Sequence, residues 1–236
     1  MRQVLPAAAD PTAPVDLASL YAPPTGRSLR VNFVSSLDGA AELDGRSGPL
    51  GGPADKLVFF TLRSLCDVVL VGAGTARAEN YGPVTIAGRS PDEQPPLALV
   101  SRSLDVRPDA RFFTEQGPRP LIITSASATA PDWLRDSADF IVAGEDQVDL
   151  RSALDQLADR GLQSVLCEGG PRLFADLAQA DLVDELCLTL APLLAGPERM
   201  GILEGPAWPH PIPLTLRSAV EAEDVLLLRY AVTRTS

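Results

Sequence analysis

Short, uninterrupted apolar runs, separated by segments with helical patterning, constrain the fold of this chain more than any other feature. The run 68–71 is the clearest, since four consecutive apolar residues are typical of a parallel strand buried on both faces of a sheet. Further runs predict strands over 30–35, 97–100, 121–124, 140–142 and 164–167. Helices are expected over 53–66, 148–158 and 171–178. This alternation predicts an α/β fold with a mostly parallel central sheet flanked by helices.

The last third of the chain follows another pattern. Residues 185–190, 214–220 and 225–232 are strand-like, and no helix separates the last two, so antiparallel C-terminal strands should close the sheet. Residues 1–25 are rich in alanine and proline, and we expect them to form an N-terminal arm that packs loosely. No repeat or persuasive linker divides the remainder, which we interpret as a single domain, 26–236.

The charge balance narrows the classes of partner. The 236 residues carry 31 acidic against 20 basic side chains, a formal net charge of −11. A surface this acidic repels phosphate backbones, which argues against nucleic-acid binding but leaves room for a small phosphorylated molecule held by a few arginines. No apolar run approaches the ~18–20 residues that cross a bilayer, and the first residues lack the apolar stretch of a secretory signal. We therefore expect no membrane partner and a cytoplasmic location.

Cysteine and histidine offer little material for other chemistry. Cys66, Cys167 and Cys187 form no C-x-x-C pair, and the last two lie in strand-like runs, which favours reduced thiols in the core. The single histidine, His210, lies in a Pro-His-Pro turn. We therefore expect no metal site and no Ser-His-Asp triad.

The first of two glycine-rich turns, Gly72-Ala73-Gly74-Thr75, directly follows the run 68–71. Absent side chains let a ligand approach the backbone, and a helix beginning at Thr75 would point its N–H groups at an anion. The turn is not a Rossmann fingerprint, because Arg77 stands at the third glycine position. An ordinary tight turn is the alternative.

The second turn, Glu168-Gly169-Gly170-Pro171, joins the strand expected over 164–167 to the helix expected over 171–178. Proline suits a first helical position, and the glycines leave the helix start open to a phosphate. The two turns together suggest a dinucleotide across the carboxyl ends of neighbouring strands. Glu168 would repel that phosphate, so we expect its carboxylate to face a sugar hydroxyl or a base N–H. An ordinary turn with a solvated glutamate is the alternative.

Ser101 and Arg102 follow the strand expected over 97–100. A hydroxyl and a guanidinium at a strand end suit the 2′-phosphate of NADPH, because arginine pairs with phosphate oxygens in a bidentate way. This pair favours NADPH over NADH as the cofactor. A solvated loop arginine is the alternative.

Five segments occur in the order seen in a known family: 36–39, 47–48, 69–75, 168–173 and 182–186. From residue 30 to residue 232 the chain resembles the C-terminal reductase domain of the bifunctional deaminase–reductase of riboflavin biosynthesis. The resemblance implies a dihydrofolate-reductase-like fold and a homodimer. It also implies NADPH-dependent reduction of the ribosyl group of a ribosylaminopyrimidine phosphate to a ribityl group. The motifs of the zinc-deaminase half, H-x-E and P-C-x-x-C, do not occur.

The resemblance implies roles for particular residues. Ser47, Arg63 and Glu168 match positions that contact the substrate, although the helix pattern alone gives Arg63 only a solvated role. Glu168 and Asp38 are the candidate catalytic residues, and an Asp-Gly turn is the alternative reading of Asp38. The candidate cofactor-binding residues, from the resemblance and the two turns, are Gly72, Gly74, Thr75, Glu79, Ser101, Arg102, Gly169, Gly170, Pro171, Arg172 and Leu173.

Three positions depart from the family. Asn32 replaces a lysine on the first strand, Glu79 replaces an aspartate, and Ile86 falls where an arginine would hold the substrate phosphate. Two rival functions therefore stay open. One is a same-fold reductase of a pterin or dihydrofolate-like substrate, and the other is a protein that binds NADPH without turnover.

Overall fold

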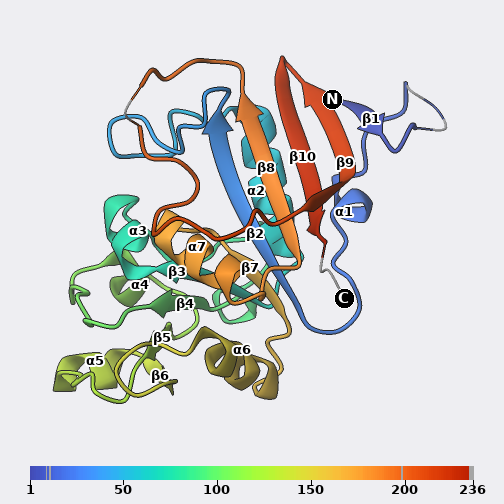
Figure 1. Ribbon diagram of the computed structural model, residues 1–236. Helices are drawn as coiled ribbons and strands as arrows, with labels where there is room; N and C mark the ends of the chain where they lie inside the picture. Colours follow the sequence, from blue (N-terminus) through green and yellow to red (C-terminus); the bar gives the residue numbers. More distant parts are fainter. Residues whose placement is uncertain (9, 11, 198, 234–236) are drawn as a thin grey trace.

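The strands of the computed structural model, which describes residues 1–8, 10, 12–197 and 199–233, form one mixed sheet (Figure 1). Their order is β1-β9-β10-β8-β2-β7-β3-β4-β5-β6. All neighbouring pairs from β8 to β6 are parallel, and β10, β9 and β1 extend the sheet in antiparallel pairs. The strands are β1 (Arg2–Leu5), β2 (Ser28–Ser36), β3 (Val68–Gly72), β4 (Leu97–Val100), β5 (Leu121–Thr124), β6 (Asp139–Val142), β7 (Ser164–Cys167), β8 (Glu185–Ala191), β9 (Leu214–Ala222) and β10 (Val225–Val232).

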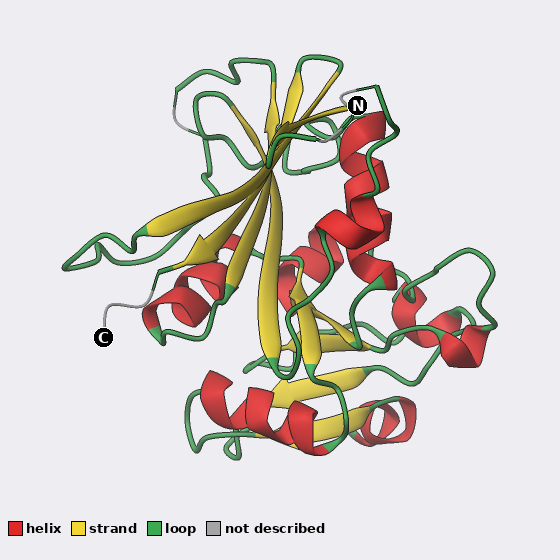
Figure 2. Ribbon diagram, turned by 90° about the vertical axis from the view of Figure 1, so that its right-hand side faces the viewer, coloured by secondary structure: helices red, strands yellow, loops and turns green. Residues whose placement is uncertain are grey.

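Helices connect the parallel strands and cover both faces of the sheet (Figure 2). They are α1 (Leu17–Leu20), α2 (Pro53–Ser64), α3 (Ala73–Ala78), the short 3-10 helix η1 (Pro91–Glu93), α4 (Arg111–Thr114), α5 (Asp132–Ser137), α6 (Leu150–Asp159) and α7 (Pro171–Gln179). The apolar side chains of α2, α3, α4 and α5 join one core cluster, and those of α6 and α7 join the other. The sheet therefore separates two hydrophobic cores.

Strand β3 shows why the apolar run 68–71 has this pattern. Val68 and Leu70 belong to the core beneath α6 and α7, whereas Val69 and Val71 belong to the core on the α2 side. None of the four is more than 1% exposed. Because successive side chains point to opposite faces, a strand covered on both faces needs apolar residues at every position. The expectation of a doubly buried parallel strand is confirmed.

The antiparallel end of the sheet is built by a hairpin. Ala222 of β9 pairs with Val225 of β10, so that Glu223 and Asp224 form a two-residue turn. Both turn residues have positive φ, 52° and 68°, which is the conformation that matches the right-handed twist of the flanking strands. Together with the parallel core and its helices, this hairpin confirms the predicted fold class.

The N-terminal arm is largely exposed, but it is attached to the sheet at two places. β1 pairs with β9 at the edge of the sheet, and the side chain of Tyr21 is 1% exposed. Arg30 of β2 donates from Nη1 to the carbonyl oxygen of Tyr21 over 2.7 Å. Contacts across more than 200 residues of sequence, such as those between β1 and β9, leave no local periodicity in the arm.

Most other differences concern element ends. The helix expected over 53–66 ends at Ser64, and the one expected over 148–158 begins at Leu150, where the Asp149 side chain caps it by accepting from Ser152 N. The helix expected to begin at Thr75 begins at Ala73. Among the described residues, no helix has the length and hydropathy needed to cross a membrane.

Candidate active site

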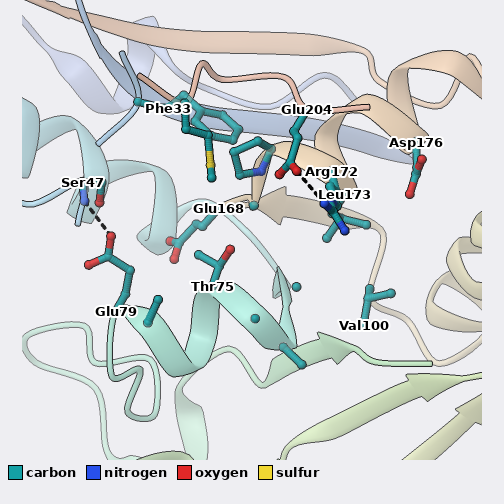
Figure 3. A pocket seen from close by; sticks show the side chains of 18 of the residues that line it. Phe33, Ser47, Thr75, Glu79, Val100, Glu168, Arg172, Leu173, Asp176 and Glu204 are labelled. Carbon is teal, nitrogen blue, oxygen red and sulfur yellow. Dashed lines mark hydrogen bonds and ion pairs between the residues drawn. The ribbon is translucent and has the colours of Figure 1, made fainter. Parts of the chain in front are cut away.

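A cavity of about 690 Å³ lies at the carboxyl ends of β3, β4 and β7. Open α/β sheets bind ligands at this edge, because loops and helix starts converge there. Its walls come from α3, the start of α7, Phe33 of β2, and loop residues such as Met200 (Figure 3). Of the candidate site residues, Ser47, Gly72, Gly74, Thr75, Glu79, Arg102, Glu168, Gly170, Pro171, Arg172 and Leu173 line it.

The two glycine turns, read separately in the sequence, are in direct contact. Gly72 N donates to the carbonyl oxygen of Gly169 over 2.8 Å. The Gly169–Gly170 peptide bond is cis, and Gly169 has φ +96°, a conformation that favours glycine. A Cβ on Gly170 would lie 2.3 Å from Thr75 Oγ1, closer than any real Cβ approaches another atom. The glycines thus let the starts of α3 and α7 meet at one point of the cavity.

The start of α7 fits a cofactor anion. Gly170 is its N-cap with no side-chain capping bond, Pro171 is its first residue, and no acidic side chain lies in the first turn. The N–H groups of a helix start carry partial positive charge and point outward, here toward the cavity. A Cβ on Gly74 would meet nothing within 4 Å, so the backbone of α3 also faces open space. These residues fit the pyrophosphate of a dinucleotide.

Glu168 is held by two neighbouring side chains. Arg63 of α2 donates from Nε to Oε1 and from Nη2 to Oε2, both over 2.7 Å, and Tyr81 Oη donates to Oε2 over 2.9 Å. The side chains of Arg63 and Glu168 are 12% and 2% exposed, so this is a largely desolvated bidentate pair. The alternatives of a solvated Glu168 and a solvated Arg63 are therefore wrong, whereas Arg102, for which a solvated loop position was the alternative, is exposed.

The surroundings of Arg63 keep it charged. The guanidinium carbon lies 4.1 Å from the centroid of the Phe59 ring and 5.8 Å from that of Tyr81. Burial opposes the charge, but the adjacent Glu168 carboxylate outweighs that effect and raises the pKa of Arg63. Two of its three nitrogens donate to Glu168, so much of its donor capacity is already committed.

A second cavity of about 320 Å³ adjoins the first, and Ser47, Glu79 and Tyr81 line both. Arg63 and Arg111 line the second cavity. The backbone N–H of Ser47 donates to Glu79 Oε1 over 2.7 Å, which ties the glycine-rich loop to the end of α3. The expected substrate contact Arg63 is therefore reached through this second cavity.

Three candidate residues line neither cavity: Asp38, Ser101 and Gly169. Asp38 accepts from Ser36 Oγ and from the backbone N–H groups of Ala195 and Gly196, at 3.0 and 2.8 Å. These bonds, the Ser36 bond foremost, lower the pKa of Asp38 from 3.8 to about 2. They support its reading as a turn aspartate, and the catalytic role stays a prediction. Ser101 is buried, and its N–H donates to the carbonyl oxygen of Ile123. Gly169 is in contact with Gly72 through its carbonyl oxygen and does not line the cavity.

The positions that depart from the family supply no cation to the cavity. Asn32 is half-buried on β2 and does not line it. Ile86 packs against the core on the α2 side, and its N–H donates to Gln94. Nearby Arg89 donates to the carbonyl oxygen of Ser64 instead.

The sequence missed several residues of the site. Tyr81, Phe33, Met200 and Glu204 line the larger cavity, and Glu204 accepts from Arg172 Nη2 over 2.6 Å (Figure 3). An aromatic residue two positions after Glu79 was the available signal for Tyr81. Met200 and Glu204 lie in a long loop after β8, which no local pattern relates to the glycine turns.

Comparison with known proteins identifies the family. The model of the RibD C-terminal domain matches residues 27–225. The chain belongs to this family. The 2,5-diamino-6-ribosylamino-4(3H)-pyrimidinone 5′-phosphate reductase of Methanothermobacter thermautotrophicus is 28% identical over 168 residues, which cover 70% of this chain and 78% of that protein. The riboflavin biosynthesis protein RibD of Bacillus amyloliquefaciens is 29% identical over 173 residues, which cover 68% of this chain but only 46% of RibD.

A solved structure gives the same result. The crystal structure of a pyrimidine reductase-like protein from Corynebacterium diphtheriae has a TM-score of 0.76 and is 29% identical, with 89% of this chain and 93% of that chain covered. The family predicted from the sequence is confirmed. The assignment to the pyrimidine reductases of riboflavin biosynthesis is confirmed as well. These reductases are oxidoreductases that use a nicotinamide cofactor.

Proposed function

We propose that the chain reduces the ribosyl group of a ribosylaminopyrimidine phosphate to a ribityl group, with NADPH as the reductant. The main support for the proposal is that one cavity is lined both by the uncapped start of α7 at Gly170 and by the Glu168 carboxylate, which Arg63 holds in a bidentate pair. The relative from Methanothermobacter thermautotrophicus, which carries the name of such a reductase, supports it.

The cofactor would lie against the two glycine turns. Backbone N–H groups at the start of α7 would bind its pyrophosphate, and Thr75 and Gly74 would contact it from α3. Arg102, which lines the cavity at the end of β4, would pair with the 2′-phosphate and so favour NADPH over NADH. When bound, the cofactor supplies the hydride, and the protein supplies orientation and a cavity with few waters.

Glu168 would bind the substrate as a hydrogen-bond acceptor whose orientation is fixed. Its carboxylate is paired with Arg63, so the two together present no net charge to the cofactor phosphates. An oxygen that accepts from Arg63 or Tyr81 keeps lone-pair capacity for a sugar hydroxyl or a pyrimidine N–H. Ser47 and Arg63, at the smaller cavity, would contact the rest of the substrate.

The test measures NADPH oxidation by its absorbance with three substrates: the ribosylaminopyrimidine, its 5′-phosphate and dihydrofolate. We expect turnover with the phosphate, and tighter binding of NADPH than of NADH. Turnover with dihydrofolate alone would establish the rival reductase. Tight NADPH binding without any turnover would establish a binding protein.

Glu168→Gln tests the carboxylate within the same assay. Glutamine keeps the shape but loses the charge that Arg63 pairs with, so we expect kcat/KM for the pyrimidine to fall about 10- to 100-fold. Glu223→Gln, an exposed position in the turn between β9 and β10 that lines neither cavity, is the matched control and should stay within about twofold of the unchanged chain. A collapse of NADPH affinity in Glu168→Gln would place Glu168 on the cofactor side and contradict the proposal.

We further propose a homodimer in the cytoplasm. The dimer rests on the family resemblance, and analytical ultracentrifugation tests it. The three cysteines, Cys66, Cys167 and Cys187, are free and buried, which suits a reducing compartment. Fractionation of cells with an antibody against the chain tests the location.

A further inference from the structure

Tyr81 lies at the end of α3, where the chain turns back toward Glu168. Asn80 has φ +52°, and Tyr81 N donates to the carbonyl oxygen of Ala76 over 2.9 Å. A left-handed residue followed by such a bond is a common helix ending, which fixes the direction of the residue that follows. The hydroxyl of Tyr81 thereby reaches Glu168 Oε2, 2.9 Å away.

The hydroxyl of Tyr81 acts as a permanent donor in this contact. Burial, and next the negative charge of Glu168, raise the pKa of Tyr81 well above its ordinary value. The phenol therefore keeps its proton at neutral pH and donates a hydrogen bond to the carboxylate. Together with two bonds from Arg63, this gives Glu168 three donors on two oxygens, which leaves its carboxylate a single orientation.

The same short helix also forms the cofactor side of the cavity. Thr75, in its first turn, abuts Gly170 at the start of α7, and Glu79, at its end, holds the Ser47 loop. Tyr81 lines both cavities, at their junction. α3 and the three residues that follow it thus connect the glycine turn to the carboxylate of Glu168.

We propose that Tyr81 is a positioning residue for the reduction, and that its hydroxyl holds the Glu168 carboxylate in the orientation that meets the pyrimidine substrate. The proposal rests on the proposed function, since it requires a pyrimidine that Glu168 contacts. Tyr81 acts through Glu168, and it does not bind the cofactor. Its loss should therefore affect the substrate and leave the cofactor unchanged.

Tyr81→Phe tests the proposal, because it removes only the hydroxyl. We expect kcat/KM for the ribosylaminopyrimidine phosphate to fall about tenfold, the low end for a lost hydrogen bond to a charged group. The Kd of NADPH, measured by cofactor fluorescence, should stay within about twofold. Tyr230→Phe is the matched control, since Tyr230 lies on β10 and lines neither cavity, and it should change neither quantity.

A double-mutant cycle with Glu168→Gln separates positioning from a merely structural role. If Tyr81 acts through Glu168, Tyr81→Phe should cost little more once Glu168 is glutamine. Full additivity, an unchanged kcat/KM in Tyr81→Phe, or an equal loss of NADPH affinity would each overturn the proposal. Absence of pyrimidine turnover in the unchanged chain overturns the proposed function as well, whereas turnover that is indifferent to Tyr81→Phe overturns this inference alone.

Discussion

A buried ion-pair network gives the sharpest stability prediction. The carboxylate of Glu185 on β8 accepts from two arginines: Arg30 Nε and Nη2 bind Oε2 at 2.9 and 2.6 Å, and Arg229 Nε and Nη2 bind Oε1 at 2.8 and 2.5 Å. The remaining nitrogens, the two Nη1 atoms, donate to the carbonyl oxygens of Tyr21 and Leu20 at 2.7 and 2.6 Å. The network joins three central strands to the end of α1.

Glu185→Gln should destabilise the fold strongly. The side chains of Arg30, Glu185 and Arg229 are 8%, 10% and 18% exposed, so neither guanidinium can turn to water when its partner loses charge. Glutamine also turns an NH₂ group toward donors. Breaking a buried pair from one side costs about 3–5 kcal/mol. For a chain of this size that corresponds to a fall in Tm of roughly 6–20 °C.

Thermal and urea unfolding, followed by circular dichroism, measure the effect. Asp109→Asn is the control, because the Arg107–Asp109 pair is 72% and 68% exposed and should contribute at most about 1 kcal/mol. A loss below about 1 kcal/mol in Glu185→Gln would refute the reasoning, since it would mean that water or a neighbouring group replaces the lost charge.

Two further predictions concern the cavity and the turn beside it. Gly74→Ala places a methyl group in open space within a helix, so the free energy of unfolding should rise by about 0.5–1 kcal/mol. Because the same methyl group would occupy space proposed for the cofactor, the Kd of NADPH should rise at least about tenfold. An unchanged Kd in a fluorescence titration would place the cofactor elsewhere. Asp38, whose pKa falls from 3.8 to about 2 on folding, stabilises the loop at Ala195 and Gly196 above about pH 4 and loses that effect as the pH falls toward 2. The protection factors of those two amides, which are exchange rates corrected for the intrinsic pH dependence, should fall over this range, and in Asp38→Asn at neutral pH. Equal protection in both chains would show that Asp38 does not hold the loop.

The sequence predicted the fold class because its strongest signals are local. Burial on both faces requires an apolar residue at each of positions 68–71 of β3, and the two-residue turn leaves β9 and β10 adjacent in the chain. The pairing of β1 with β9 and the burial of Tyr21 depend on contacts between distant segments, and the arm has no apolar run or periodic pattern that would reveal them.

Similar limits apply to the site. The glycine turns were found because glycine and proline mark special backbone positions, but their contact through Gly72 and Gly169 is a property of strand order. Arg63 was assigned to the substrate by resemblance, whereas the helix pattern alone gave it to solvent. Its pairing with Glu168 spans 105 residues, and no spacing rule connects the two.

The pairing of Glu168 with Arg63 explains how a carboxylate can lie beside the proposed anion site at the start of α7. A lone Glu168 next to Gly170 would repel a cofactor phosphate, yet its charge is matched by Arg63 and directed away from the start of α7. In Figure 3 the Glu168 side chain points toward Ser47 and Glu79, while Arg172 and Leu173 lie on the other side. The cavity is thus divided into a half whose backbone N–H groups suit an anion and a half whose fixed acceptor suits hydroxyl and N–H donors. Hydride transfer requires the cofactor and the substrate to lie in contact, so the two halves of the cavity must adjoin. The contact between the two glycine turns brings the two halves together.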